Sequence, residues 1–159
     1  DYYYTKENKE EQIKLFESQL AIAEKYNMPV IVHSRDATED TINSLKKFKC
    51  NGVIHSFSGS LETAKIYIKM GYLLGVNGVI TFKNAKIKDV IKEVGLKNIV
   101  LETDSPYLTP VPFRGTQNNP GHVLEIAQFV ADLYNISLEE LAEQTNKNIT
   151  EMYKKIKLD

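Results

Sequence analysis

The chain has 159 residues, of which 42% are hydrophobic and 26% are charged, and its formal net charge is −1. These values are typical of one globular domain, expected over residues 1–159, and they argue against an extended basic surface that wraps DNA. The only cysteine, Cys50, excludes an intramolecular disulfide framework and fits a reducing compartment, so we expect a cytoplasmic location. No apolar run approaches the length of a membrane span, and no membrane is expected as a partner.

The first residues have the character of an interrupted strand. Residue 1 is aspartate, not methionine, and three tyrosines follow it. Such an aromatic run is typical of a strand end, so we expect residues 1–4 to complete a strand that begins earlier. The sequence is therefore expected to be an internal or C-terminal piece of a longer protein.

Helices and strands are predicted to alternate along the rest of the chain. Apolar residues recur at helical spacing within residues 5–26, 38–48, 61–70, 83–94 and 123–134. Short β-branched runs predict strands over residues 30–34, 52–57, 72–78 and 98–101. Ser60 is a plausible N-cap, and a capping-box pattern at Ser137 opens a short helix, followed by another over residues 146–155. Residues 105–121 form a long connection with four of the five prolines, and such connections are often functional.

Four apolar strands, each followed by a helix, predict an α/β fold with parallel strands and outer helices. Two architectures fit this pattern, namely an open doubly wound sheet and part of a (β/α)8 barrel. No glycine-rich phosphate loop follows any strand, which disfavours a dinucleotide-binding fold. Four such units correspond to half of a barrel.

Three side chains suited to metal binding close separate strands. His33 ends the first strand, His55 the second and Asp104 the fourth. The carboxyl ends of parallel strands lie along one edge, where active sites form. Two imidazoles and a carboxylate there favour Zn²⁺, Mn²⁺ or a similar ion that acidifies a water. Asp104 is a candidate ligand, general base, or both.

Two further charged residues lie close to these candidates. Strand alternation places Glu102 on the same face as Asp104. Glu102 either supports a metal ligand from beneath or is a buried acid bonded to backbone or hydroxyl groups. Arg35 is suited to binding phosphate oxygens, with a salt bridge to Asp36 or Asp40 as the alternative.

Other polar side chains are weaker candidates for contact with a substrate. Arg114 is a second candidate phosphate contact, although a solvated loop arginine is the slightly favoured interpretation. The turn at Ser58 could hold an anion at a helix start, but capping is the favoured explanation. His122 is expected to be structural or at the surface. The tyrosines of residues 2–4 either stack on a base or pack at the rim of the core.

Taken together, these motifs resemble the TatD-type metal-dependent deoxyribonucleases, a branch of the amidohydrolase-like TIM barrels. Agreement runs almost end to end, in order and at the expected distances. The matching segments are residues 1–4, 29–37, 54–60, 78–85, 102–108, 110–115 and 119–120.

The resemblance implies a (β/α)8 barrel of which this chain is roughly the second half. It implies two divalent ions (Zn, Mg or Mn) and hydrolysis of phosphodiester bonds in DNA, with 3′ to 5′ exonuclease action. His33 and His55 would bind the second metal, and Asp104 would bind the first and activate water. Family members also carry an HxH pair and a glutamate ahead of the segment that matches Asp1. This sequence has neither, so we expect its metal site to be incomplete.

Two alternatives stay open at the level of sequence. One is a metal-dependent amidohydrolase or esterase, such as an aminoacyl-tRNA deacylase, because the ligand set does not separate these reactions. The other is an inactive half-barrel fragment that self-associates or pairs with the missing N-terminal half, since a half-barrel leaves two sheet edges unpaired.

Overall fold

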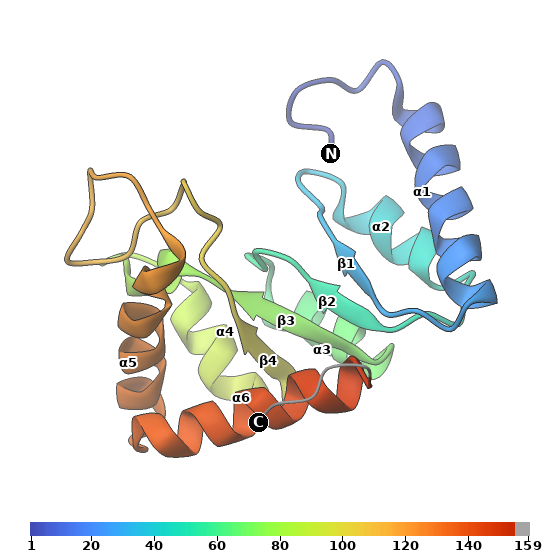
Figure 1. Cartoon of the computed structure of the whole chain (residues 1–159). Coiled ribbons are helices and arrows are strands. Elements are labelled where there is room, and N and C mark those ends of the chain that lie inside the picture. Colours follow the sequence, from blue (N-terminus) through green and yellow to red (C-terminus); the bar gives the residue numbers. More distant parts are fainter. Residues whose placement is uncertain (155–159) are drawn as a thin grey trace.

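The computed structural model describes residues 1–154, in which four parallel strands form one sheet in the order β1-β2-β3-β4 (Figure 1). The strands are β1 (Val30–Val32), β2 (Gly52–Ile54), β3 (Tyr72–Val76) and β4 (Ile99–Leu101). The α-helices are α1 (Lys9–Lys25), α2 (Thr38–Leu45), α3 (Leu61–Lys69), α4 (Ile87–Val94), α5 (Val123–Tyr134) and α6 (Leu138–Met152). The predicted parallel sheet with strands and helices in alternation is thus confirmed.

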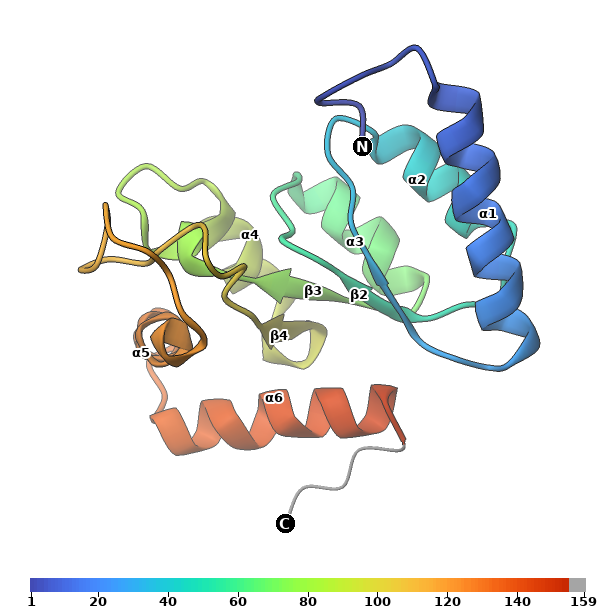
Figure 2. The ribbon, with the colours of Figure 1, turned by 45° about the horizontal axis from the view of Figure 1, so that its top comes forward.

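Most strand side chains are buried on both faces of the sheet, Ile31 of β1 being exposed, which explains why the strands are apolar throughout. On one face, residues such as Ile54, Leu74 and Ile99 join a large core with α1 to α5 and the start of α6. On the other face, Val53, Leu73 and Val100 pack against the end of α6. Figures 1 and 2 show α6 crossing beneath the sheet to reach this second face.

The two outer strands differ from the middle of the sheet. β1 and β4 are each paired on one side only within residues 1–154. Ile31 of β1 lies opposite Val53 of β2, but its side chain is 70% exposed, whereas that of Val53 is buried. An apolar surface at an unpaired strand edge is therefore open in this chain.

Local hydrogen bonds explain where two of the helices begin. The Ser60 hydroxyl accepts from the Thr63 amide at 3.3 Å, which confirms this N-cap. Ser137 and Glu140 form the predicted capping box at the start of α6. In residues 1–154 no helix combines the length and the apolar character needed to cross a membrane.

The prediction that residues 1–4 end a strand is wrong, because the segment makes one backbone hydrogen bond instead of a ladder. The Tyr2 amide donates to the Arg35 carbonyl at 2.9 Å, and the Tyr2 hydroxyl donates to Asp40. The buried Tyr2 side chain thus anchors the segment against the beginning of α2.

The prediction of two short helices after Ser137 is also wrong, because α6 is continuous from Leu138 to Met152. Asn148, inside the second predicted helix, donates to the carbonyls of Leu96 and Ile99, both at 2.8 Å. Its side chain therefore ties α6 to the start of β4. The predicted end of this helix at Lys155 lies outside the described residues.

Several helices and strands are shorter than predicted, and one such difference lies in the segment after β3. The strand ends at Val76, and residues Gly78–Thr81 form a 3-10 helix, η1, while α4 begins only at Ile87. A Cβ atom on Gly78 would lie 2.0 Å from the Leu108 carbonyl oxygen. The chain turns here because glycine lets the long loop after β4 approach closely.

Candidate active site at the carboxyl edge of the sheet

The centre of the candidate site is His55, which follows β2 directly. Its Nδ1 atom lies 2.8 Å from a carboxylate oxygen of Glu102, and its Nε2 atom lies 2.9 Å from Oδ1 of Asp104. Both acids follow β4, on the far side of β3 from His55. The imidazole is therefore held between two carboxylates across the edge of the sheet.

A glycine in the intervening strand makes this arrangement possible. A Cβ atom on Gly75 of β3 would lie 2.8 Å from the carboxylate of Glu102. Any larger residue would displace that carboxylate. The absence of a side chain at Gly75 thus leaves the space in which Glu102 reaches His55.

Glu102 combines the two roles left open by its sequence. One carboxylate oxygen faces His55, and the other accepts from the Ser56 backbone amide at 2.5 Å. The Ser56 hydroxyl in turn accepts from the Asn77 amide group at 2.7 Å. Glu102 is consequently a backbone-anchored acid that also fixes the orientation of a histidine.

The two histidines of the site have opposite electrostatic environments. The hydrogen bond to Glu102 raises the pKa of His55 above its ordinary value, against the opposing effect of burial, and the charge of Asp104 adds to the rise. Burial lowers the pKa of His33, and the neighbouring charge of His55 lowers it further. The imidazolium form is therefore more stable at His55, and less stable at His33, than in an unperturbed histidine.

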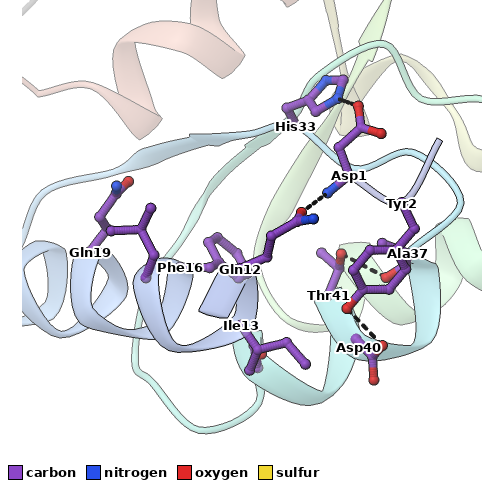
Figure 3. Close-up of a pocket in the computed structure, with 12 residues that line it drawn as sticks. Asp1, Tyr2, Gln12, Ile13, Phe16, Gln19, His33, Ala37, Asp40 and Thr41 are labelled. Atoms are coloured by element: carbon purple, nitrogen blue, oxygen red, sulfur yellow. Dashed lines mark hydrogen bonds and ion pairs between the residues drawn. The ribbon is translucent and has the colours of Figure 1, made fainter. Parts of the chain in front are cut away.

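His33 follows β1 and lies beside His55, with 6.2 Å between the ring centroids. Its Nε2 atom lies 2.6 Å from Oδ2 of Asp1 (Figure 3). The same close-up shows Gln12 of α1 pointing toward Asp1, and Tyr2 reaching Asp40. His33 is thus close to His55, but the carboxylate that it contacts belongs to Asp1 and not to Glu102 or Asp104.

The donor chemistry fits a divalent metal ion, although the described residues do not assemble a complete set. An imidazole whose second nitrogen meets a carboxylate is the usual form of a metal-binding histidine. However, no three His, Cys, Asp or Glu side chains of residues 1–154 form a group that could hold an ion. The prediction that His33, His55 and Asp104 bind metal therefore needs donors beyond these three.

A cavity of about 480 Å³ brings together most of the predicted site residues. His33, Arg35, His55, Ser58 and Asp104 all line it. Glu102 supports this wall through His55. The cavity joins the candidate metal donors to a cation and a hydroxyl, as a site for an anionic substrate requires.

The two arginines proposed to contact phosphate have different settings. The Arg35 guanidinium lies 3.3 Å from the ring centroid of Tyr3. The predicted alternative, a salt bridge to Asp36 or Asp40, is not formed within residues 1–154, where Asp40 pairs with Lys9. The Arg114 guanidinium stacks on Phe82 and donates to a loop carbonyl. Arg114 is not among the residues that line the cavity.

Sequence reasoning missed Asn118, which fixes the loop that carries Asp104. Its side-chain amide donates to the carbonyls of Thr103 at 2.8 Å and Tyr107 at 2.6 Å, and the asparagine is 3% exposed. Asp104 itself has a positive φ of 60°, an uncommon conformation for a residue other than glycine. The sequence signal that could have indicated this role is the position of an asparagine inside a proline-rich connection.

His122, which was expected to be structural, lies in the same loop framework. Its Nδ1 atom lies 2.9 Å from the side-chain oxygen of Asn118, and its ring stacks on Phe113 at 4.7 Å. These contacts orient Asn118 and give His122 a packing role.

Comparisons with known proteins place this chain in a known family. The sequence model of the family described as TatD related DNase matches residues 1–154. The chain therefore belongs to the TatD related DNase family.

Two curated relatives are metal-dependent hydrolases by name, both described as uncharacterized. YabD of Bacillus subtilis is 40% identical over 158 residues, covering 97% of this chain and 62% of YabD. YcfH of Escherichia coli K12 is 41% identical over 157 residues, covering 96% of this chain and 59% of YcfH. The chain thus spans about three fifths of the length of these relatives.

Solved structures show the same fold. The TatD homologue YjjV of Escherichia coli K12 is 32% identical, with a TM-score of 0.85 over 91% of this chain and 57% of that chain. An amidohydrolase of Saccharomyces cerevisiae is 19% identical, with a TM-score of 0.81 over 96% of this chain and 61% of that chain, which shows likeness of fold alone.

Proposed function

We propose that this chain supplies part of an active site that hydrolyses phosphodiester bonds in DNA with divalent metal ions. The observation that carries the proposal is His55, held between Glu102 and Asp104 in a cavity that Arg35 also lines. Family membership and the names of YabD and YcfH support a metal-dependent hydrolase. The description of the family supports DNA as the substrate.

Each residue has a distinct part in this proposal. Bound divalent ions, Zn, Mg or Mn, would acidify a water and polarise a phosphoryl oxygen. His33 and His55 would hold one ion through imidazole nitrogens, and Asp104 would hold the other and accept the proton of the attacking water. Glu102 keeps the His55 ring in place from Nδ1. Arg35 and Ser58 bind phosphate oxygens, because stacking on Tyr3 leaves the in-plane N–H groups of Arg35 free for an anion.

We propose further that the four strands are the second half of a (β/α)8 barrel, and that the remaining metal donors come from a segment outside this chain. Three observations support this extension. The sheet is wholly parallel, β1 and β4 each have one unpaired edge in residues 1–154, and the chain spans 59% to 62% of the named relatives. The pairing partner of those edges is then the other half of the barrel.

The test is Asp104→Asn in the full-length protein that contains this chain. Divalent-dependent cleavage of single-stranded DNA should fall by roughly 100-fold or more, because a positioned proton acceptor contributes about that much. The matched control is Asp132→Asn on α5, an exposed acid distant in sequence from the site, which should leave the rate unchanged. Undiminished cleavage by Asp104→Asn would refute the role of Asp104.

A second substrate in the same assay separates the chemical classes. An aminoacyl ester offered to the same preparation tests the deacylase alternative, since the ligands suit both reactions. Cleavage of DNA but not of the ester supports the proposal. Cleavage of the ester alone replaces it with the amidohydrolase or esterase alternative.

A further inference from the structure

Two exposed tyrosines stand at the cavity of the candidate site. Tyr4 is 82% exposed and Tyr107 is 71% exposed, and both line the cavity that holds His33, Arg35 and Asp104. Large aromatic side chains with this exposure leave their apolar ring faces open to solvent, and beside the cavity these faces are available for stacking.

Tyr4 is the outer member of an anchored row of aromatic and cationic groups. Its ring packs edge to face against that of Tyr3, with 4.9 Å between the ring centroids. The guanidinium of Arg35 lies over the Tyr3 ring, 3.3 Å from its centroid. The buried Tyr2 holds the start of the row through its hydrogen bonds to Arg35 and Asp40. Tyr4 is consequently supported by fixed neighbours while its own ring is free.

Tyr107 is fixed relative to the candidate catalytic acid. Its amide donates to the Asp104 carbonyl at 2.9 Å, and its own carbonyl accepts from Asn118 at 2.6 Å. The backbone at Tyr107 thus forms one tight turn with Asp104, while the ring stays exposed. Tyr107 and Asp104 also line the same cavity, so a group stacked on the ring lies at the mouth of the site that contains Asp104.

We infer that Tyr4 and Tyr107 form a base-stacking rim for a DNA strand whose phosphate lies at Arg35 and Asp104. The inference rests on the proposed function and adds a binding determinant to it. Every nucleobase offers a flat π-face, so stacking on tyrosine holds a strand without reading its sequence. The rim would therefore let the cavity bind a single DNA strand of any sequence.

The test measures binding apart from cleavage. The full-length protein is held in EDTA, and fluorescence anisotropy follows a labelled single-stranded oligonucleotide and an abasic strand of the same length and charge. Wild type should bind the strand with bases more tightly. Tyr4→Ala and Tyr107→Ala should each reduce that preference by roughly 5- to 10-fold, the lower part of the range for loss of a stacked base, whereas the Phe variants should retain it.

The control is Tyr26→Ala, because Tyr26 is 62% exposed but follows the C-terminal end of α1 and does not line the cavity. Equal affinity of wild type for both strands, or equal weakening of both by the Ala variants, would overturn the inference. The proposed function is judged separately by Asp104→Asn cleavage, so a base preference that survives a failed cleavage test still supports the rim.

Discussion

The contacts of His55 determine whether its imidazole carries a proton or can offer a lone pair. With Glu102 at Nδ1 and Asp104 at Nε2, the pKa of the ring is raised, so the ring holds a proton more strongly than a free histidine does. A metal ion bound at Nε2, as proposed above, would compete with this proton, because only the neutral ring can bind a metal.

The raised pKa of His55 gives a pH-dependent prediction. The protonated ring stabilises the fold fully below its unfolded pKa of about 6.5, and this contribution is lost as pH rises through the higher folded value. Glu102→Gln should lower the His55 pKa, because it removes the largest cause of the shift. NMR titration of the histidines in EDTA measures it, with His33, whose pKa is lowered by burial, as the internal comparison. An unchanged His55 pKa in Glu102→Gln would contradict this explanation.

Gly75 provides a second test, because a methyl group there would displace the Glu102 carboxylate. We expect Gly75→Ala to weaken metal binding by the full-length protein by roughly 10- to 100-fold, as loss of a partner to a metal-binding histidine does. Isothermal titration with Mn²⁺ or Zn²⁺ measures this. In a Glu102→Ala background the same substitution should cost little more, since the displaced group is gone. Full additivity of the two substitutions would contradict the steric explanation.

At the scale of residues, the sequence predicted the histidines and acids better than their supports. His33, His55 and Asp104 were recognisable because each follows a buried strand, and alternation placed Glu102 on the side of Asp104. Asn118 was not predicted, because its contacts depend on the path of an irregular loop. The stacking of Arg35 on Tyr3 depends likewise on the folding of residues 1–4.

At the scale of elements, periodicity located the helices and strands, while their ends depended on tertiary contacts. Hydrophobic spacing predicted α5 with its observed bounds, Val123–Tyr134. It could not show that Asn148 is bonded within a continuous α6, or that Gly78 begins a 3-10 turn against Leu108. These features come from contacts between segments far apart in the sequence.

The loop after β4 depends on one buried asparagine, so Asn118→Ala should be disruptive. The substitution leaves the carbonyls of Thr103 and Tyr107 without their donor, at a cost of about 1–3 kcal/mol in the free energy of unfolding. Chemical denaturation followed by circular dichroism measures this. Asn84→Ala, in an exposed loop, is the matched control and should change stability by less than about 0.5 kcal/mol. Equal stability of both variants would show that Asn118 does not support the loop.

At the scale of the whole molecule, the alternation of strands and helices was sufficient to predict a parallel sheet with outer helices. The comparisons with solved structures then identified the fold with that of the TatD homologues. What the sequence did not indicate is the position of α6 against the second face of the sheet, since its own pattern does not say which face it covers.

The open edges of the sheet lead to a prediction about association. The chain of 159 residues alone should form dimers or larger species, because β1 presents unpaired backbone groups beside the exposed Ile31. Size-exclusion chromatography with light scattering measures this. Ile31→Lys should shift the population toward monomer, whereas Ile22→Lys on exposed α1 should not. A monodisperse monomer for the unchanged chain would contradict the prediction.

The strand order has a consequence for how the chain folds. Each strand pairs with the next along the chain, so paired residues are only about 20 to 25 positions apart, and closing such short loops is fast. The contacts of Glu102 with Ser56 and His55 span 46 and 47 positions and need β4 in place. We therefore expect the βα units to assemble in succession and the bonds around His55 to form late. Substitutions at Glu102 should accordingly act on the unfolding rate more than on the folding rate.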